Sequence, residues 1–226
     1  HVAVSELDEK GNRLGGTVIR FSPELKTKGQ ISEEIGRVMA KVGRYCAERK
    51  KPLIMEDLDT TLAKHGMKYG CKKKNRHASL FAYRKMTACL ENQAYKQSFG
   101  IYKINPAYTS QMGKFLYLRP LGLSIHEAAS YAIGLKGMGI REKLLPDERL
   151  LALLPEKTKE KLKNGTDIVS IIPAWKHLTK AFRGVSPHSF YRELPYEVLE
   201  ERKKGTLKSI ASEMKKWTQN NRYEYA

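Results

Sequence analysis

Three acidic side chains follow a short apolar run in the first third of the chain. Residues 53–55 are Leu-Ile-Met, and Glu56, Asp57 and Asp59 come next. A run of this kind predicts a strand buried on both faces, and open α/β sheets place ligands at the carboxyl ends of their strands. Carboxylates grouped there can hold divalent metal ions such as Mg²⁺. Acids at such positions also cap helices, so capping remains the alternative interpretation.

A basic segment comes after these acids. Residues 60–90 contain no Asp or Glu. The cationic side chains that we expect to contact nucleic-acid phosphates are Lys64, Lys68, Lys72, Lys73, Lys74, Arg76, Arg84 and Lys85. Aromatic residues between them, such as Tyr69, could stack on bases. A block of like charges can also be a solvent-exposed loop without a partner, and this alternative stays open.

The chain as a whole is strongly basic. Its 226 residues include 42 Lys and Arg against 24 Asp and Glu, which gives a formal net charge of +18. A surplus of this size attracts polyphosphates whatever their sequence. Because much of the excess gathers in one segment, nucleic acid is the expected partner.

Hydrophobic spacing predicts the elements in front of the acids. Residues 2–7 and 17–21 read as two strands with turn-forming residues between them, which predicts a β-hairpin. Apolar side chains recur at helical spacing over residues 30–49 and predict an amphipathic helix. Pro52 cannot continue that helix, so the chain is expected to enter the short strand at residue 53.

Hydrophobic spacing also predicts the elements after the basic segment. Apolar residues over 80–95 predict a second helix, with Gly100 placed for a left-handed cap. Residues 101–104 then read as another strand. Parallel strands need a helical crossover, so this order predicts an α/β domain with a mixed sheet, as in an RNase H-like fold: a hairpin followed by β-α-β-α.

The domain is expected to end with a further helix. Ser124 and Glu127 have the spacing of a capping box, which predicts a helix start at Ser124 and a capping role for Glu127. We therefore predict one domain over residues 1–146. Residues 147–226 are lysine-rich and broken by Pro and Gly, and we predict a helical, basic C-terminal extension.

The remaining composition limits the choice of compartment and metal. The three cysteines are Cys46, Cys71 and Cys89, without a CxxC pair, so we expect a reduced chain and no structural zinc. We find no run of apolar residues long enough to cross a bilayer and no signal peptide. A soluble, cytoplasmic protein without a membrane partner is the expectation.

Three stretches together resemble a known family. They are residues 53–58, residues 84–111, which end in Asn-Pro-Ala-Tyr-Thr-Ser-Gln, and residues 126–131, His-Glu-Ala-Ala-Ser-Tyr. They resemble the RuvC-like, RNase H-like nuclease domain of the transposon-encoded OrfB/TnpB transposase family, related to type V CRISPR effectors. The resemblance spans residues 1–145.

The resemblance implies a function and a site. It implies a divalent-metal-dependent DNA endonuclease of the two-metal type that uses Mg²⁺ or Mn²⁺ and is guided by RNA, so that base pairing reads the sequence. On this basis Glu56 becomes a catalytic metal ligand, with Asp57 and Asp59 as supporting or capping groups. The basic segment becomes part of the nucleic-acid channel.

The chain also departs from the family pattern. The family's first catalytic Asp would lie just before residue 1, so it is either on a preceding segment or absent. Where the family has a third Asp, this chain has His126 and Glu127. His126 could replace the acid as a catalytic metal ligand or could simply begin the helix, and both interpretations stay open. Glu127 would at most support such a site.

The family's four-cysteine zinc insertion is also missing between residues 111 and 124. These departures leave an alternative function: a catalytically eroded RuvC-like module that binds nucleic acid without cutting it. A basic RNA-binding protein whose acidic strand end is coincidental is the third possibility, and a fold unlike RNase H would support it.

Overall fold

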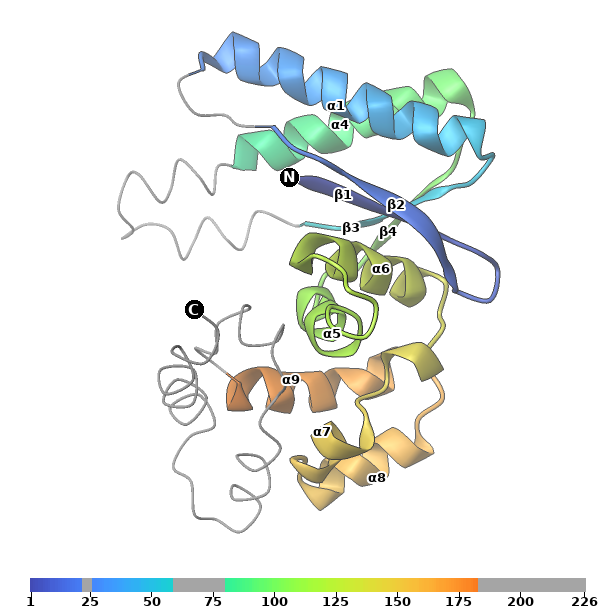
Figure 1. Ribbon diagram of the computed structural model, residues 1–226, viewed down its shortest axis with the longest axis vertical. Helices are drawn as coiled ribbons and strands as arrows, with labels where there is room; N and C mark the ends of the chain where they lie inside the picture. The colour runs from blue at the N-terminus through green and yellow to red at the C-terminus, as the bar shows by residue number, and fades with distance from the viewer. Residues whose placement is uncertain (22–25, 59–79, 183–226) are drawn as a thin grey trace. The chain divides into compact units, whose positions relative to one another are not determined.

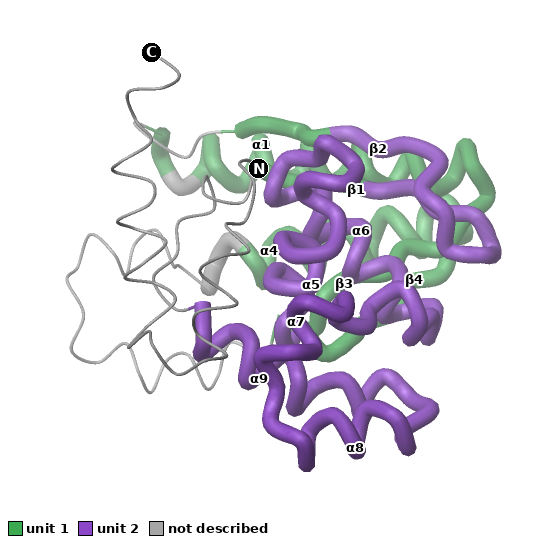
Figure 2. Tube along the Cα trace, turned by 60° about the horizontal axis from the view of Figure 1, so that its bottom comes forward, with its two compact units in different colours: residues 1–4, 18–106 green, residues 5–17, 107–226 purple. Residues whose placement is uncertain are grey.

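The structure is a computed structural model that describes residues 1–21, 26–58 and 80–182 (Figure 1). Over these ranges the chain is mixed α/β, with helices predominating over two small sheets. It divides into two compact units (Figure 2). Unit 1 contains residues 1–4 and 18–106, and unit 2 contains residues 5–17 and 107–226. No helix in the described part of the chain has the length and apolarity needed to span a membrane.

The predicted hairpin is present. Strands β1 (Val2–Leu7) and β2 (Arg13–Ile19) pair in a two-stranded sheet, and β2 begins earlier than the alternation indicated. The turn is held by Asp8, whose carboxylate accepts hydrogen bonds from the Asn12 backbone at 2.7 Å and side chain at 2.8 Å. These bonds lower the pKa of Asp8. Gly11 supplies the positive φ of +71° that the turn requires.

The first predicted helix is also present, as α1 (Lys28–Glu48). It begins with a capping box in which Thr27 and Gln30 each accept a hydrogen bond from the other's backbone N–H. One face is buried and forms much of the core of unit 1, through Ile35, Val38, Met39, Val42 and Cys46.

The strand–helix–strand unit has the parallel pairing that its sequence order predicts. Strand β3 (Leu53–Glu56) pairs in parallel with β4 (Ile101–Ile104), and α4 (Leu80–Gln97) lies between them in the chain. Figure 1 shows α1 and α4 on one side of this strand pair. The described strands form two separate two-stranded sheets instead of the single mixed sheet that the sequence predicted. The RNase H-like arrangement stays a prediction.

Helices α5 (Thr109–Leu116) and α6 (Ile125–Gly137) contribute buried side chains to the core of unit 2. The two helices approach so closely that a Cβ on Gly113 would lie 2.4 Å from the Ala128 carbonyl oxygen. Only a residue without a side chain fits this crossing without displacing the backbone of α6.

The hairpin turn is anchored within unit 2 by hydrogen bonds to its backbone. Tyr131 of α6 donates its hydroxyl to the Gly11 carbonyl at 2.8 Å. Lys143, in the 3₁₀ turn η2 (Glu142–Leu144), donates to the same carbonyl at 3.0 Å and to the Asn12 side chain at 2.7 Å. The turn is thereby attached to two elements that are distant in sequence.

The described part of the predicted C-terminal extension is helical. It contains α7 (Glu148–Ala152), α8 (Glu156–Asn164), the 3₁₀ turn η3 (Val169–Ile171) and α9 (Ile172–Ala181). Trp175 of α9 is fully buried in the same core as α5 and α6, and its indole N–H donates to the Leu144 carbonyl at 2.9 Å. These helices therefore share one core with α5 and α6. The domain boundary predicted at residue 146 stays a prediction.

Candidate functional site

Glu56 is the last residue of β3, and its backbone position is determined by pairing with β4. Its Cα partner is Ile104, the last residue of β4. The next residue, Asp57, donates its backbone N–H to the Ile104 carbonyl at 2.7 Å. Glu56 is half-buried and Asp57 is exposed. The two carboxylates thus follow each other at the carboxyl end of a parallel strand pair, where α/β sheets hold ligands.

The register also determines which face of the sheet carries Glu56. Residues directly opposite each other share a face, and successive residues of a strand alternate between faces. Leu53 and Met55 of β3 pack against the core of unit 1, together with Ile101 of β4. Glu56 therefore points to the other face, which it shares with Ile54, Tyr102 and Ile104.

The described part of the basic segment is small. Arg84 and Lys85 lie in α4, where Arg84 is exposed and Lys85 is half-buried. The remaining predicted site residues of this region lie outside the described residues: Asp59, Lys64, Lys68, Lys72, Lys73, Lys74 and Arg76. Their roles stay predictions.

The start of α6 shows the role of Glu127. Its backbone N–H donates to the Ser124 hydroxyl at 3.3 Å, while its Oε2 accepts from the Ser124 backbone at 3.1 Å and from the Ser124 hydroxyl at 2.7 Å. Its Oε1 accepts from Arg13 at 3.3 Å. The Ser124 hydroxyl and backbone, with the charge of Arg13, lower the pKa of Glu127. The predicted capping box is confirmed, and both carboxylate oxygens are engaged.

His126 lies in the first turn of α6 and is exposed. Glu56 belongs to unit 1 and His126 to unit 2. A role for His126 as a ligand therefore stays a prediction.

The segment between β4 and α5 has an unusual backbone. Tyr108, which precedes α5, has a φ of +65°, in the left-handed region that a bulky side chain rarely adopts. In unit 2 the buried Lys136 donates to the Ala107 carbonyl at 2.9 Å. Thr109 is only 1% exposed. The hydrogen bond from Lys136 holds the chain just before α5, and no local sequence pattern indicated it.

A second buried cation lies on α5. Lys114 is 7% exposed, and burial lowers the pKa of its ammonium group to about 8. Its Nζ lies 5.9 Å from the centre of the Phe115 ring. The sequence did not single out Lys114, because a lysine on a helix is ordinarily exposed.

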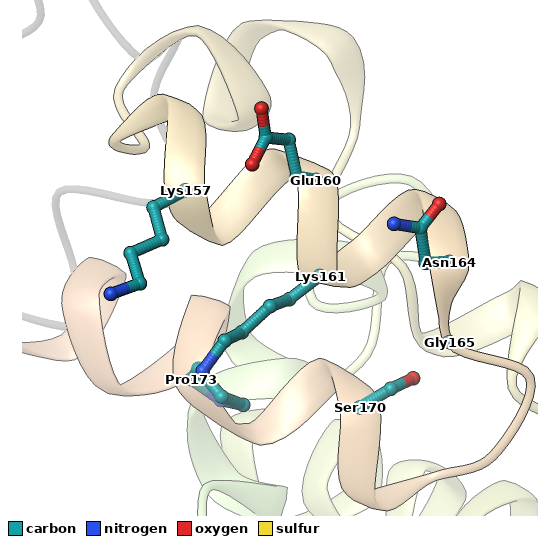
Figure 3. A pocket seen from close by; sticks show the side chains of 7 residues that line it. All are labelled: Lys157, Glu160, Lys161, Asn164, Gly165, Ser170 and Pro173. Atoms are coloured by element: carbon teal, nitrogen blue, oxygen red, sulfur yellow. The ribbon is translucent and has the colours of Figure 1, made fainter.

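An open pocket lies between α8 and the η3–α9 segment of unit 2 (Figure 3). Its volume is about 480 Å³, and the Lys161 side chain extends from α8 toward Pro173. The hydroxyl of Ser170, on the opposite wall, already donates to the Asp167 carbonyl at 2.6 Å and accepts from Arg141 at 3.0 Å. The polar groups in this wall thus stabilise the fold of unit 2.

A protein metal site usually needs several His, Cys, Asp or Glu side chains close together. Over residues 1–21, 26–58 and 80–182, no three His, Cys, Asp or Glu side chains group as a set of ligands. Glu127 is engaged by Ser124 and Arg13. The described residues therefore offer Glu56, with Asp57 beside it, as a partial set that needs further ligands to hold an ion.

Comparison of the chain with protein-family models, with curated proteins and with solved structures found no match. The family resemblance therefore remains a hypothesis that depends on the three sequence stretches over residues 53–58, 84–111 and 126–131. The geometry of Glu56 and the basic character of the chain are independent of it.

Proposed function

We propose that this chain is a RuvC-like nuclease domain of the OrfB/TnpB type, which hydrolyses phosphodiester bonds of DNA with the help of a divalent metal ion. The observation that supports this most is the position of Glu56, at the carboxyl end of β3 where β3 pairs in parallel with β4. A carboxylate there lies where α/β sheets of this kind hold their ligands.

In this proposal Glu56 is a metal ligand, while the ligand role of His126, which belongs to unit 2, stays a prediction. A bound Mg²⁺ or Mn²⁺ would supply Lewis-acid stabilisation of the charge that develops on the phosphate. The other ligands would come from outside the described residues. Asp57, which follows Glu56 and is exposed, would add negative charge near the ion.

The net charge of +18 supports a nucleic-acid substrate. Cationic side chains such as Arg84 would neutralise phosphates and hold the strand without reading its sequence. In the guided form of the proposal, a guide RNA pairs with the target and determines which sequence is cut.

The experiment is a cleavage assay with the full-length protein and labelled single-stranded DNA, in Mn²⁺ or Mg²⁺ and in EDTA. The variants are Glu56→Gln, which removes the charge but keeps the shape, and the matched control Asp57→Asn. We expect metal-dependent cleavage by the parent, a loss of at least about 100-fold in Glu56→Gln, and a smaller loss in Asp57→Asn. Equal cleavage by the parent and Glu56→Gln would contradict the assignment of Glu56.

A specific observation favours the second candidate function, an eroded module that binds nucleic acid without cutting. At the third motif, both carboxylate oxygens of Glu127 are hydrogen-bonded, one to Arg13 and the other to Ser124 at the start of α6. Under this alternative, the parent and Glu56→Gln would bind DNA or RNA equally tightly and neither would cut. The cleavage assay run beside a binding titration therefore separates the two.

A further inference from the structure

We propose that Tyr102 is a positioning residue on which a base of the single-stranded substrate stacks, next to Glu56 on the same face of the sheet. This inference rests on the proposed function, because it names the contact that would hold the strand at that site. It adds a substrate feature: an unpaired base within one or two nucleotides of the bond that is attacked.

The register of the strand pair places the two residues together. Tyr102 is the Cα partner of Ile54, and Glu56 is the partner of Ile104. Tyr102 and Glu56 therefore lie on the face opposite to Leu53, Met55 and Ile101, which pack in the core. Along the strand they are offset by two residues, or about 6.6 Å.

That offset matches the spacing of nucleotides. Stacked nucleotides repeat at about 3.4 Å along one strand of a duplex. Tyr102 and Glu56 are offset by about 6.6 Å along the strands and lie on neighbouring strands about 4.8 Å apart, so their Cα atoms are roughly 8 Å from each other, which corresponds to about two steps. A base stacked on Tyr102 would thus bring a phosphate one or two nucleotides away to the carboxyl end of β3. Glu56 lies at that end.

Tyr102 is a large aromatic side chain that is mostly exposed. In the four-residue strand β4, Tyr102 is 60% exposed and Lys103 is also exposed, while Ile101 and Ile104 are half-buried. A large ring left in water forgoes stabilisation from burial, and a stacked base would cover it.

The ring of Tyr102 lies next to Gly100. A Cβ on Gly100 would lie 3.6 Å from Cε2 of Tyr102 and 3.9 Å from its Cζ. Because Gly100 has no side chain, nothing from that residue projects over the ring. Together with its 60% exposure, this leaves ring surface on which a base can stack, and such stacking tolerates any base sequence.

The test uses an oligonucleotide that carries the fluorescent base 2-aminopurine, which is quenched when it stacks. Titration with the full-length protein measures the affinity and the quenching together. We expect Tyr102→Ala to weaken binding about 10-fold and to abolish the quenching, because the stacked base loses its aromatic partner. Tyr102→Phe keeps the ring and should retain both.

The matched control is Tyr95→Ala. Tyr95 also belongs to unit 1 and is 88% exposed, but it lies on α4 and not on the face that carries Glu56. We expect Tyr95→Ala to bind the oligonucleotide with the parent's affinity and to quench 2-aminopurine as the parent does. All variants should melt at the parent's temperature, because neither tyrosine is in the core.

The possible outcomes distinguish a failure of the Tyr102 inference from a failure of the proposed nuclease function. Binding by the parent with unchanged affinity and quenching in Tyr102→Ala would overturn the role of Tyr102 and leave the nuclease proposal standing. Failure of the parent to bind any single-stranded oligonucleotide would overturn both. An equal loss in Tyr95→Ala would also overturn the inference, because it would show general rather than site-specific stacking.

Discussion

Arg13 and Glu127 are 114 residues apart in the chain, and Nη2 of Arg13 lies 3.3 Å from Oε1 of Glu127. The other carboxylate oxygen accepts from Ser124. The ion pair joins the hairpin strand β2 to the start of α6 within unit 2. It identifies Glu127 as a group that holds the helix start, as the capping box predicted, near the place where the OrfB/TnpB family has its third Asp.

Replacing Glu127 by Gln should therefore destabilise the protein without changing its affinity for metal. We expect a loss of about 0.5–1 kcal/mol in the free energy of unfolding at pH 7, because glutamine can keep the capping hydrogen bond, as Gln30 does in α1, but loses the ion pair with Arg13 and the negative charge at the helix start. Because the pKa of Glu127 is lowered on folding, its contribution is present above the ordinary pKa and is lost as the pH falls through the folded value. Urea unfolding of parent and variant at pH 7 and pH 3 measures this.

The control for that experiment is Glu160→Gln, an exposed acid in α8 of the same unit. Its unfolding free energy should stay within about 0.5 kcal/mol of the parent. A drop in Mn²⁺ affinity in Glu127→Gln, with stability unchanged, would contradict the capping role.

Gly113→Ala should weaken the crossing of α5 and α6. The added Cβ would lie 2.4 Å from the Ala128 carbonyl oxygen and 2.6 Å from the Ala129 nitrogen, so the helices must move apart. Overpacking of this kind costs about 1–3 kcal/mol, and backbone atoms cannot rotate away. We expect a loss near the upper end of that range, measured by chemical denaturation.

Gly36→Ala is its control, because it adds the same methyl group to a helix where no atom beyond the neighbouring backbone of that helix lies within 4 Å of the new Cβ. Alanine is favoured over glycine in a helix by about 1 kcal/mol, so this variant should be as stable as the parent or more so. If both variants had the same effect, the close crossing at Gly113 would be refuted.

Lys114→Met should stabilise the protein at neutral pH. Burial lowers the pKa of Lys114 to about 8, so below that pH the folded state holds an ammonium group at a cost of about 1–3 kcal/mol. Between the folded pKa and the ordinary lysine value of 10.5, the folded state loses this proton while the unfolded state keeps it, so the parent gains stability as the pH rises. The advantage of the variant should shrink over the same range.

The unfolding free energies of the parent and Lys114→Met are measured at pH 7 and pH 10.5. Titratable groups present in both proteins contribute equally, so they cancel when the two free energies are subtracted. Lys157→Met is the control, since Lys157 is exposed on α8. A constant difference between parent and Lys114→Met across the range would show that Lys114 is not desolvated in the folded protein.

Cys46 should resist alkylation in the folded protein. It is 5% exposed in the core of unit 1, and burial raises the pKa of its thiol to about 11. The reactive thiolate is therefore scarce at pH 8, and the reagent lacks access. Mass spectrometry after iodoacetamide treatment should find Cys46 unmodified until urea unfolds the chain, with Cys89, which is half-buried, modified earlier. Equal rates would contradict the burial of Cys46.

Local patterns predicted the elements that place Glu56. The helical spacing over α1, the apolar run of β3 and the strand after Gly100 depend on neighbouring residues, so the sequence reveals them directly. The capping box at Ser124 was predictable for the same reason, because its partners are three residues apart. The parallel pairing followed from the order of the elements.

Contacts between distant residues could not be predicted in this way. Nothing near Arg13 indicates a partner 114 residues later, and nothing near Lys114 indicates that its helix face packs in a core. Tyr102 was recoverable in principle: once β3 and β4 are aligned, alternation places it on the face of Glu56. The sequence did not single out Tyr102, because its position relative to Glu56 depends on the register between β3 and β4, and the sequence alone does not reveal that register.

The most direct test of the central claim is a titration of the full-length protein with Mn²⁺, followed by electron paramagnetic resonance in the presence of a single-stranded oligonucleotide. Bound Mn²⁺ loses its sharp free-ion signal, so the parent's affinity and stoichiometry can be read directly. We predict that Glu56→Gln weakens Mn²⁺ binding at least about 10-fold while Asp57→Asn changes it less. Identical titrations of the parent and Glu56→Gln would contradict the account, since Glu56 would then hold no metal.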